Sequence, residues 1–239
     1  MNQNHGEFDC DLHSRKAPVD CGMGQHLRSK LENRSDENPS VRGGNKQAIR
    51  VSKPGIRALG IAESFVRSDS LSTLAGLVMR GDMRIDGVAL AEITVGGMDA
   101  TDGVLSIYRK LGREDINILM LSGNVISWFN IIDPERIHRE TGLPVISVTY
   151  EESDGLERYI EEYFPGDVER LMKYRALGER SAIRLKTGYD LFVRAHGISL
   201  KETRAVLNRF TIEGRIPEPV RVARLVARAA MRIGRESGE

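Results

Sequence analysis

The sequence predicts an α/β fold in which one mixed sheet carries helices on both faces. Three strand-like segments, at residues 57–63, 73–80 and 83–95, precede the first helical pattern. After that helix the chain alternates between strand and helix, beginning with a strand-like segment at 116–121. The first two segments carry uninterrupted apolar runs, which are typical of central strands covered on both faces. This order of elements predicts that the segments 57–63 and 116–121 lie in one sheet.

The boundaries of the first elements carry local signals. Gly81 and Asp82 predict the turn between the second and third strands. A helix is expected to begin at Asp99, whose side chain is placed to cap it, and to end at Gly112. Its apolar residues recur at intervals of three and four, as they do on one buried face: Val104, Leu105, Tyr108 and Leu111.

The second half of the chain continues the alternation. Asp-Pro-Glu at 133–135 predicts the start of a helix, with the aspartate as its cap. A strand is expected at 142–148, and residues 151–169 are acidic with a helical pattern. Residues 189–195 alternate as a late strand does, and Ser199 carries the signature of a helix cap.

A last helix is expected from Pro217 to about Arg232. One face is predicted from its apolar residues: Val222, Val226, Ala229 and Ile233. Arginines form a second stripe at helical spacing: Arg221, Arg224, Arg228, Arg232 and Arg235. The planar guanidinium group suits phosphate, so the stripe, and Arg221, Arg224 and Arg228 in particular, predicts contacts with nucleic acid. A solvated helix face is the other interpretation.

The first 50 residues differ from the rest in composition. Asn, Gln, Ser, Gly, Asp and Arg dominate, and the apolar residues are isolated and without period. Such a segment buries too little surface to offset the entropy of the chain. We expect residues 1–50 to be a disordered amino-terminal tail and 51–239 to form the folded domain; a start codon assigned too far upstream would produce the same composition.

Bulk composition is that of an ordinary water-soluble protein. The apolar fraction is 40% and the charged fraction 29%, and the net charge of +1 neither requires nor excludes nucleic acid. No apolar run approaches the roughly 20 residues that cross a bilayer, and the first residues do not resemble a signal peptide. Two cysteines imply no disulfide framework. A reduced, cytoplasmic location without membrane contact is therefore expected.

Three strands followed by helix and strand in alternation is also the order of a ribonuclease H-like core. In that architecture, acids at the ends of the central strands hold divalent metal for phosphodiester hydrolysis. Glu63 ends the first strand-like segment, and Asp99 and Asp102 lie where the first helix begins. This layout indicates a nuclease.

Several blocks of residues stand out along the chain: Gly60-Ile61-x-x-Ser64-Phe65, Thr94-Val95-x-Gly97-x-Asp99-Ala100-Thr101-Asp102, Leu119-Met120-Leu121-x-Gly123, Phe129-Asn130-Ile131-Ile132-Asp133, Thr141 to Ile146 and Gly214 to Ala223. In this order the blocks resemble the archaeal endonuclease dU family, a distant relative of endonuclease V. The resemblance covers roughly residues 55–232. It implies a ribonuclease H-like fold and magnesium-dependent (manganese being possible) cleavage of nucleic acid, expected to be DNA, that contains deaminated bases such as uracil, in DNA repair.

Transferred residue by residue, the resemblance keeps one acid, Asp99, at the start of the first helix. With the neighbouring acids added, we expect Glu63 and Asp99 as catalytic carboxylates and Glu63, Asp99 and Asp102 as metal ligands. Two expected acids are missing. The first-strand acid position falls on Ala62, and the fourth-strand position falls on Ser122. Since neighbours in a strand point to opposite faces, Glu63 replaces an acid at Ala62 only if the strand ends or bulges there.

Each candidate also has a purely structural interpretation. Asp99 could serve only as a helix cap, Asp102 could favour the helix dipole, and Glu63 could be solvated at a strand end. Trp128 could stack on a displaced base or pack in the core. Two functions therefore stand: a metal-dependent endonuclease, which the sequence favours, and a non-catalytic relative that keeps a nucleic-acid-binding surface. The sequence does not indicate an oligomeric state.

Overall fold

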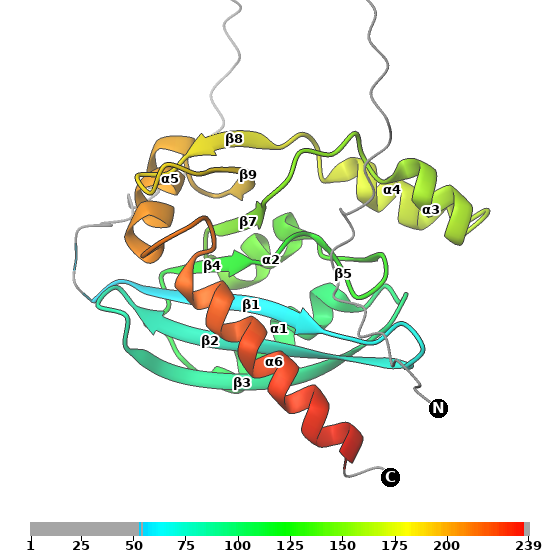
Figure 1. Ribbon diagram of the computed structural model, residues 1–239, viewed down its shortest axis with the longest axis horizontal. Coiled ribbons are helices and arrows are strands. Elements are labelled where there is room, and N and C mark those ends of the chain that lie inside the picture. The colour runs from blue at the N-terminus through cyan, green and yellow to red at the C-terminus, as the bar shows by residue number, and fades with distance from the viewer. Residues whose placement is uncertain (1–52, 54, 237–239) are drawn as a thin grey trace, which may run out of the picture. The chain divides into compact units, whose positions relative to one another are not determined.

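The computed structural model describes Lys53 and residues 55–236 of the chain (Figure 1). By its contacts the chain divides into two units, Met1–Ala48 and Ile49–Glu239, and the described residues all belong to the second unit. The predicted disordered tail at 1–50 lies outside the described residues. Among the described helices, none has the length and apolar character needed to cross a membrane.

One seven-stranded sheet runs through the domain in the order β3-β2-β1-β4-β7-β9-β8. The central strand β1 pairs antiparallel with β2 and parallel with β4, so the first and fourth strands share one sheet as predicted. β7 pairs parallel with β4 and antiparallel with β9. The strands are β1 (Arg57–Ser64), β2 (Leu71–Arg80), β3 (Ile85–Thr94), β4 (Ile118–Leu121), β7 (Val145–Thr149), β8 (Ser181–Arg184) and β9 (Asp190–His196). The predicted mixed α/β fold is confirmed.

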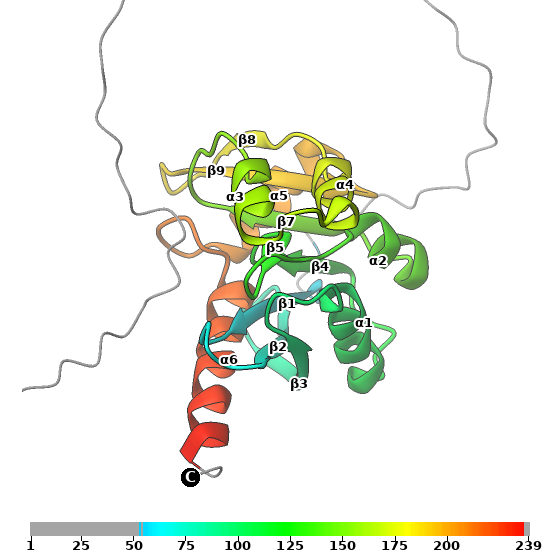
Figure 2. The same ribbon diagram turned by 90° about the vertical axis from the view of Figure 1, so that its right-hand side faces the viewer.

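Helices cover both faces of the sheet. In Figures 1 and 2, α6 lies on the face opposite α1 and α2. The buried residues form two apolar clusters, of which one includes residues of α5 and α6 and the other residues of α1 and α2. β1 contributes alternate residues to the two clusters, with Ala58 and Ala62 in the first and Leu59 and Ile61 in the second. The helices named here are α1 (Ala100–Leu111), α2 (Pro134–Thr141), α5 (Leu200–Phe210) and α6 (Glu218–Glu236).

Local signals placed several boundaries correctly. Gly112 ends α1 in the left-handed conformation, and Asp133 caps α2 by accepting from the backbone amide of Arg136. Ser199 opens α5 with a complete capping box. The acidic segment 151–169 differs from its prediction, because only part of it is helical.

That segment contributes to two short helices, α3 (Glu157–Tyr163) and α4 (Val168–Ala176). Gly166 adopts a positive φ of 82° between them, and Asp167 caps α4 through its side chain. The acidic pattern therefore predicted helix correctly but missed the break. Two short strands that the pattern also missed, β5 (Val125–Ile126) and β6 (Asn130–Ile131), form a separate hairpin.

The predicted apolar face of α6 is confirmed at Val222 and Val226, which are partly buried and pack against the core, and wrong at Ala229 and Ile233, which are exposed. Val220, Ala223 and Ala227 are fully buried, whereas Ile233 is 64% exposed. The helix packs closely on β1, where a Cβ atom on Gly60 would lie 2.3 Å from the carbonyl group of Pro219. Small side chains permit this close approach, so size rather than hydrophobicity selects the buried face.

Candidate functional site

The parallel strands β1, β4 and β7 end on the same side of the sheet, the side to which the β1 arrowhead points in Figure 1. Glu63 lies near the end of β1, Ser122 directly follows β4, and Tyr150 directly follows β7. Arg224 of α6 reaches this edge and donates a hydrogen bond from Nη2 to Ser122 Oγ at 2.7 Å. We call Glu63, Ser122, Tyr150 and Arg224 the strand-end cluster.

Glu63 is half-buried in this cluster. Burial raises the pKa of its carboxyl group above the ordinary 4.5, because the charged form loses water. Backbone amides of Glu63 and Ser127 and the charge of Arg224 oppose that rise in pKa without cancelling it. A carboxylate with a raised pKa is a better proton acceptor than an ordinary one.

Tyr150 provides a second perturbed group. Its hydroxyl is buried and has no hydrogen-bond partner among the described residues. Burial raises the pKa of Tyr150 to about 12, against the opposing charges of Arg224 and Arg215. Arg215 lies 5.7 Å from the ring centroid of Tyr150, measured from its Cζ atom. The cluster therefore brings positive charge to the strand ends, around one carboxylate.

Asp99 stands at the start of α1 but does not cap the helix through its side chain, which corrects the structural alternative. Instead the carboxylate accepts the amide of Thr94 at 3.0 and 3.1 Å, the hydroxyl of Thr94 at 2.8 Å and the side-chain amide of Asn130 at 2.6 Å. Although burial raises the pKa of Asp99, the hydrogen bonds from Asn130 and Thr94 hold it below the ordinary value. The amide of Ala100, at the start of α1, donates to Asn130 Oδ1 instead.

Asp102 points toward α2. It forms an ion pair of 2.6 Å with Arg136, and 60% of its side chain is exposed. The structure therefore directs the three predicted carboxylates to different partners: Glu63 faces Arg224, Asp99 holds Thr94 and Asn130, and Asp102 pairs with Arg136.

The carboxylates of Glu63, Asp99 and Asp102 do not form a site that fits a divalent cation. Within residues 55–236, no group of three or more His, Cys, Asp and Glu side chains is arranged to hold a metal. Three donors, the amide and hydroxyl of Thr94 and the side-chain amide of Asn130, occupy both carboxylate oxygens of Asp99. Glu63 is left as one carboxylate beside a guanidinium, whereas magnesium prefers several oxygen ligands.

The predicted arginines occupy different environments. Arg224 is half-buried in the strand-end cluster, whereas Arg221 and Arg228 are exposed. Arg221 pairs with Glu218, one turn before it, through an Nε contact of 2.9 Å. Among the three predicted arginines, Arg224 therefore reaches the strand ends, through its hydrogen bond to Ser122.

Trp128 lies in a turn between β5 and β6 beside the strand-end cluster. Ser127 is the link, because its backbone amide hydrogen-bonds to Glu63 while its hydroxyl donates to Ser72 Oγ at 2.7 Å. Trp128 is half-buried, and Arg67 stacks over its ring with Cζ at 3.8 Å from the centroid. Sequence reasoning found Trp128 but missed Arg67, whose one sequence signal is its place four residues after Glu63.

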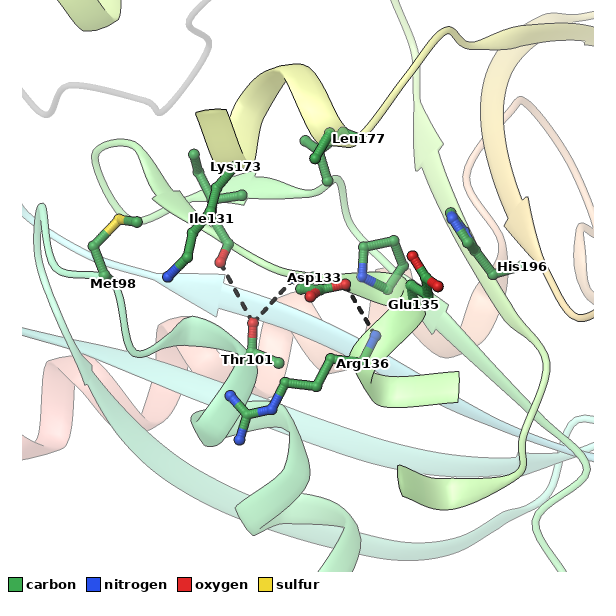
Figure 3. A pocket seen from close by; sticks show the side chains of 11 residues that line it. Met98, Thr101, Ile131, Asp133, Glu135, Arg136, Lys173, Leu177 and His196 are labelled. Atoms are coloured by element: carbon green, nitrogen blue, oxygen red, sulfur yellow. Dashed lines mark hydrogen bonds between the residues drawn. The ribbon is translucent and has the colours of Figure 1, made fainter. Parts of the chain in front are cut away.

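A cavity of about 170 Å³ lies apart from this cluster, among α1, α2, α4 and β9 (Figure 3). Asp133, Thr101, Lys173 and His196 are among its lining residues. The hydroxyl of Thr101 accepts the amide of Asp133 at 3.0 Å, and Asp133 caps α2, so these polar groups already hold the local backbone. Burial lowers the pKa of His196, against the charges of Glu135 and Asp133.

Comparisons with known proteins match the sequence and fold. The family model described as endonuclease dU matches residues 54–231. A UPF0215 protein of Pyrobaculum calidifontis is 37% identical over 170 residues, covering 71% of this chain and 93% of that protein. A crystal structure of a protein of unknown function from Archaeoglobus fulgidus has a TM-score of 0.64 at 31% identity, covering 73% of this chain and 98% of the other. Human endonuclease V has a TM-score of 0.55 at 18% identity, covering 79% and 91%, and therefore shows similarity of fold.

Proposed function

Because the chain belongs to the endonuclease dU family, we propose that it is a nuclease acting on phosphodiester bonds in nucleic acid that contains deaminated bases, uracil in particular. The observation that carries the proposal is the position of Arg224 at the ends of the parallel strands, where it donates to Ser122 and its charge acts on the carboxyl group of Glu63. One group can accept a proton and the other can bind a phosphate, which are the two tasks of hydrolysis. DNA is the expected substrate, and an endonuclease V of Ciona intestinalis with this fold was crystallised with a DNA that contains an inosine followed by a ribo-adenosine.

In the proposed reaction, Arg224 binds a non-bridging oxygen of the scissile phosphate, with the Ser122 hydroxyl beside it. Glu63 accepts a proton from the attacking water as the new oxygen–phosphorus bond forms. The ester bond to the leaving oxygen then breaks, and that oxygen takes a proton from solvent. The guanidinium stabilises the negative charge that develops on the phosphoryl oxygens.

The magnesium or manganese implied by the family resemblance stays a prediction. Endonuclease V-like nucleases generally depend on divalent metal, but the carboxylates described here do not form a site that fits one. Cleavage assays with magnesium, with manganese and with a chelator decide whether this chain shares that dependence.

A second candidate function has its own support. Ser122 stands where the resemblance expects an acid and accepts a hydrogen bond from Arg224, and Asp99 is fully engaged in local hydrogen bonds. A non-catalytic nucleic-acid-binding protein would keep the arginines while dispensing with the metal site. Its substrate-binding surface would be the same strand-end cluster.

The experiment compares labelled single strands and duplexes that contain one uracil or one hypoxanthine with matched normal strands. We expect cleavage near the deaminated base by the wild type and loss of cleavage in Glu63→Gln, with binding retained. Glu92→Gln, on the exposed face of β3, is the matched control and should cleave normally. Binding without cleavage under all metal conditions would establish the non-catalytic alternative.

A further inference from the structure

The turn that carries Trp128 has an unusual backbone. Ser127, Trp128 and Phe129 have φ angles of 42°, 61° and 62°. Three consecutive residues with side chains in the left-handed region are disfavoured, because Cβ crowds the following carbonyl group. Strain of this kind persists only where surrounding contacts enforce it, and it concentrates at functional sites.

A buried arginine supplies those contacts. Arg170 of α4 is 4% exposed and donates to the carbonyl oxygens of Gly96 at 2.8 Å, Gly97 at 3.0 Å and Phe129. Its charge is balanced by Asp167 at 3.0 Å, and its guanidinium lies 3.9 Å from the centroid of Phe164. Hydrogen bonds from Arg170 therefore hold the turn against α4 in a backbone conformation that its own residues disfavour.

The two adjacent aromatic residues of the turn differ in burial, although their rings meet edge to face with centroids 5.3 Å apart. Phe129 is 1% exposed and packs near Tyr163 and Phe164, with centroids 5.9 Å away in each case. Trp128 instead reaches the surface, where Tyr163, 41% exposed, stands with its centroid 4.8 Å away at an angle of 60°. Core packing accounts for Phe129 but does not require Trp128 to be displayed.

Arg67 completes the arrangement. Its Cζ lies 3.8 Å from the Trp128 centroid and 5.3 Å from that of Tyr163. Arg67 is exposed and follows β1, the strand that ends beside Glu63. A planar guanidinium at stacking distance from an indole occupies the same space that a planar nucleobase would fill.

We propose that the Trp128 face covered by Arg67 receives an unpaired nucleobase, with Tyr163 as the second aromatic wall. On binding, the base replaces the Arg67 guanidinium, which moves to a backbone phosphate of the same strand. This inference rests on the proposed nucleic-acid substrate and identifies its form: a single-stranded or displaced base beside the strand-end cluster. The hydrogen bond from Ser127 to Glu63 ties the position of the stacked base to that cluster.

The chain offers a direct probe, because Trp128 is its one tryptophan. The intrinsic fluorescence of the full chain should be quenched by a single-stranded oligonucleotide and much less by a blunt duplex. An oligonucleotide of abasic sites should bind weakly and leave the fluorescence unchanged. Arg67→Ala should keep the quenching but flatten the salt dependence of binding, because the phosphate contact is lost.

Variants then separate stacking from packing. In anisotropy measurements with a labelled single strand, Trp128→Ala should weaken binding by about tenfold or more. Trp128→Phe, which keeps an aromatic face, should restore most of the affinity. Arg84→Ala is the matched control for Arg67, since Arg84 is 77% exposed at the opposite end of the sheet.

Binding of single strands without quenching of Trp128 would overturn the proposal, as would equal affinities of Trp128→Ala and wild type. Thermal melting of each variant identifies any that fail to fold. The quenching measurement on Arg67→Ala leaves Trp128 unchanged, so it tests the proposal without a substitution at the tryptophan itself. Cleavage without quenching would reject the proposed base-binding site at Trp128 and leave the proposed nuclease activity intact. Quenching without cleavage would support the base-binding site and reject the nuclease activity.

Discussion

Arg224 donates a 2.7 Å hydrogen bond to Ser122 at the end of β4, where the family resemblance expects a metal-binding acid. A guanidinium in that position repels a divalent cation and attracts a phosphate. The strand ends therefore hold a cationic group at a position where the resemblance expects an anionic one.

The first prediction concerns this pair. Ser122→Asp alone should raise magnesium affinity little, because the new carboxylate would pair with Arg224. Ser122→Asp combined with Arg224→Gln should raise it clearly, since Glu63 and the new acid would then face each other without a cation between them. Isothermal titration with magnesium measures the difference. Ser122→Asp with Arg221→Gln is the control, and equal affinities for the two double variants would refute this account.

The second prediction concerns pH. Glu63 has a folded-state pKa raised above 4.5, so its protonated form favours folding at low pH and this contribution is lost as pH rises through the raised pKa. The unfolding free energy of wild type minus that of Glu63→Gln should therefore fall as pH increases above about 4.5. Denaturant melts of both proteins across that range measure it. A difference that is constant with pH would show that Glu63 is not perturbed.

If Glu63 accepts the proton from water, cleavage should require its ionised form. The rate should rise with pH through a pKa above the ordinary glutamate value, and this limb should disappear in Glu63→Gln. A pH–rate profile on a uracil-containing strand provides the measurement. A rate that is flat through the acid limb would assign the proton to another group.

The third prediction concerns Arg170. Arg170→Ala should destabilise the protein by about 3–5 kcal/mol, because three carbonyl oxygens and Asp167 lose a buried partner. Arg170→Lys should recover only part of this, since an ammonium group lacks the planar fork. Lys173→Ala, on the same helix but more exposed, should cost under about 1 kcal/mol. Urea denaturation compares the three, and a small loss in Arg170→Ala would mean that the turn holds itself.

The fourth prediction concerns phosphate contacts. Arg224→Gln should lower nucleic-acid affinity and reduce the slope of log affinity against log salt by roughly one. Arg228→Gln, one turn along the predicted stripe, should act in the same direction if α6 follows the phosphate backbone. Arg84→Gln, at the opposite end of the sheet, should change neither quantity. An unchanged slope for Arg224→Gln would remove it from the binding surface.

The sequence by itself determined the elements whose signals are local. Gly112 ends α1 and Ser199 opens α5 because capping depends on residues within one turn. The apolar runs of β1 and β2 also indicated central strands, because a strand that is buried on both faces shows no alternation of polar and apolar residues. The strand pattern placed Glu63 correctly near a strand end, next to Ala62, where the family resemblance expects an acid.

Only the tertiary structure decided how side chains from distant segments meet. The buried face of α6 depends on how closely the helix approaches Gly60, which its own periodicity does not contain. Asp99 could have capped α1 or bound metal, and its choice of Thr94 and Asn130 follows from where the β6 hairpin lies. The contact of Arg67 with Trp128 joins residues from two loops, and no local preference encodes it. The left-handed backbone of Ser127, Trp128 and Phe129 likewise depends on Arg170 of α4, and the pKa of Glu63 depends on Arg224 of α6, because both are set by neighbours in space that lie far away in sequence.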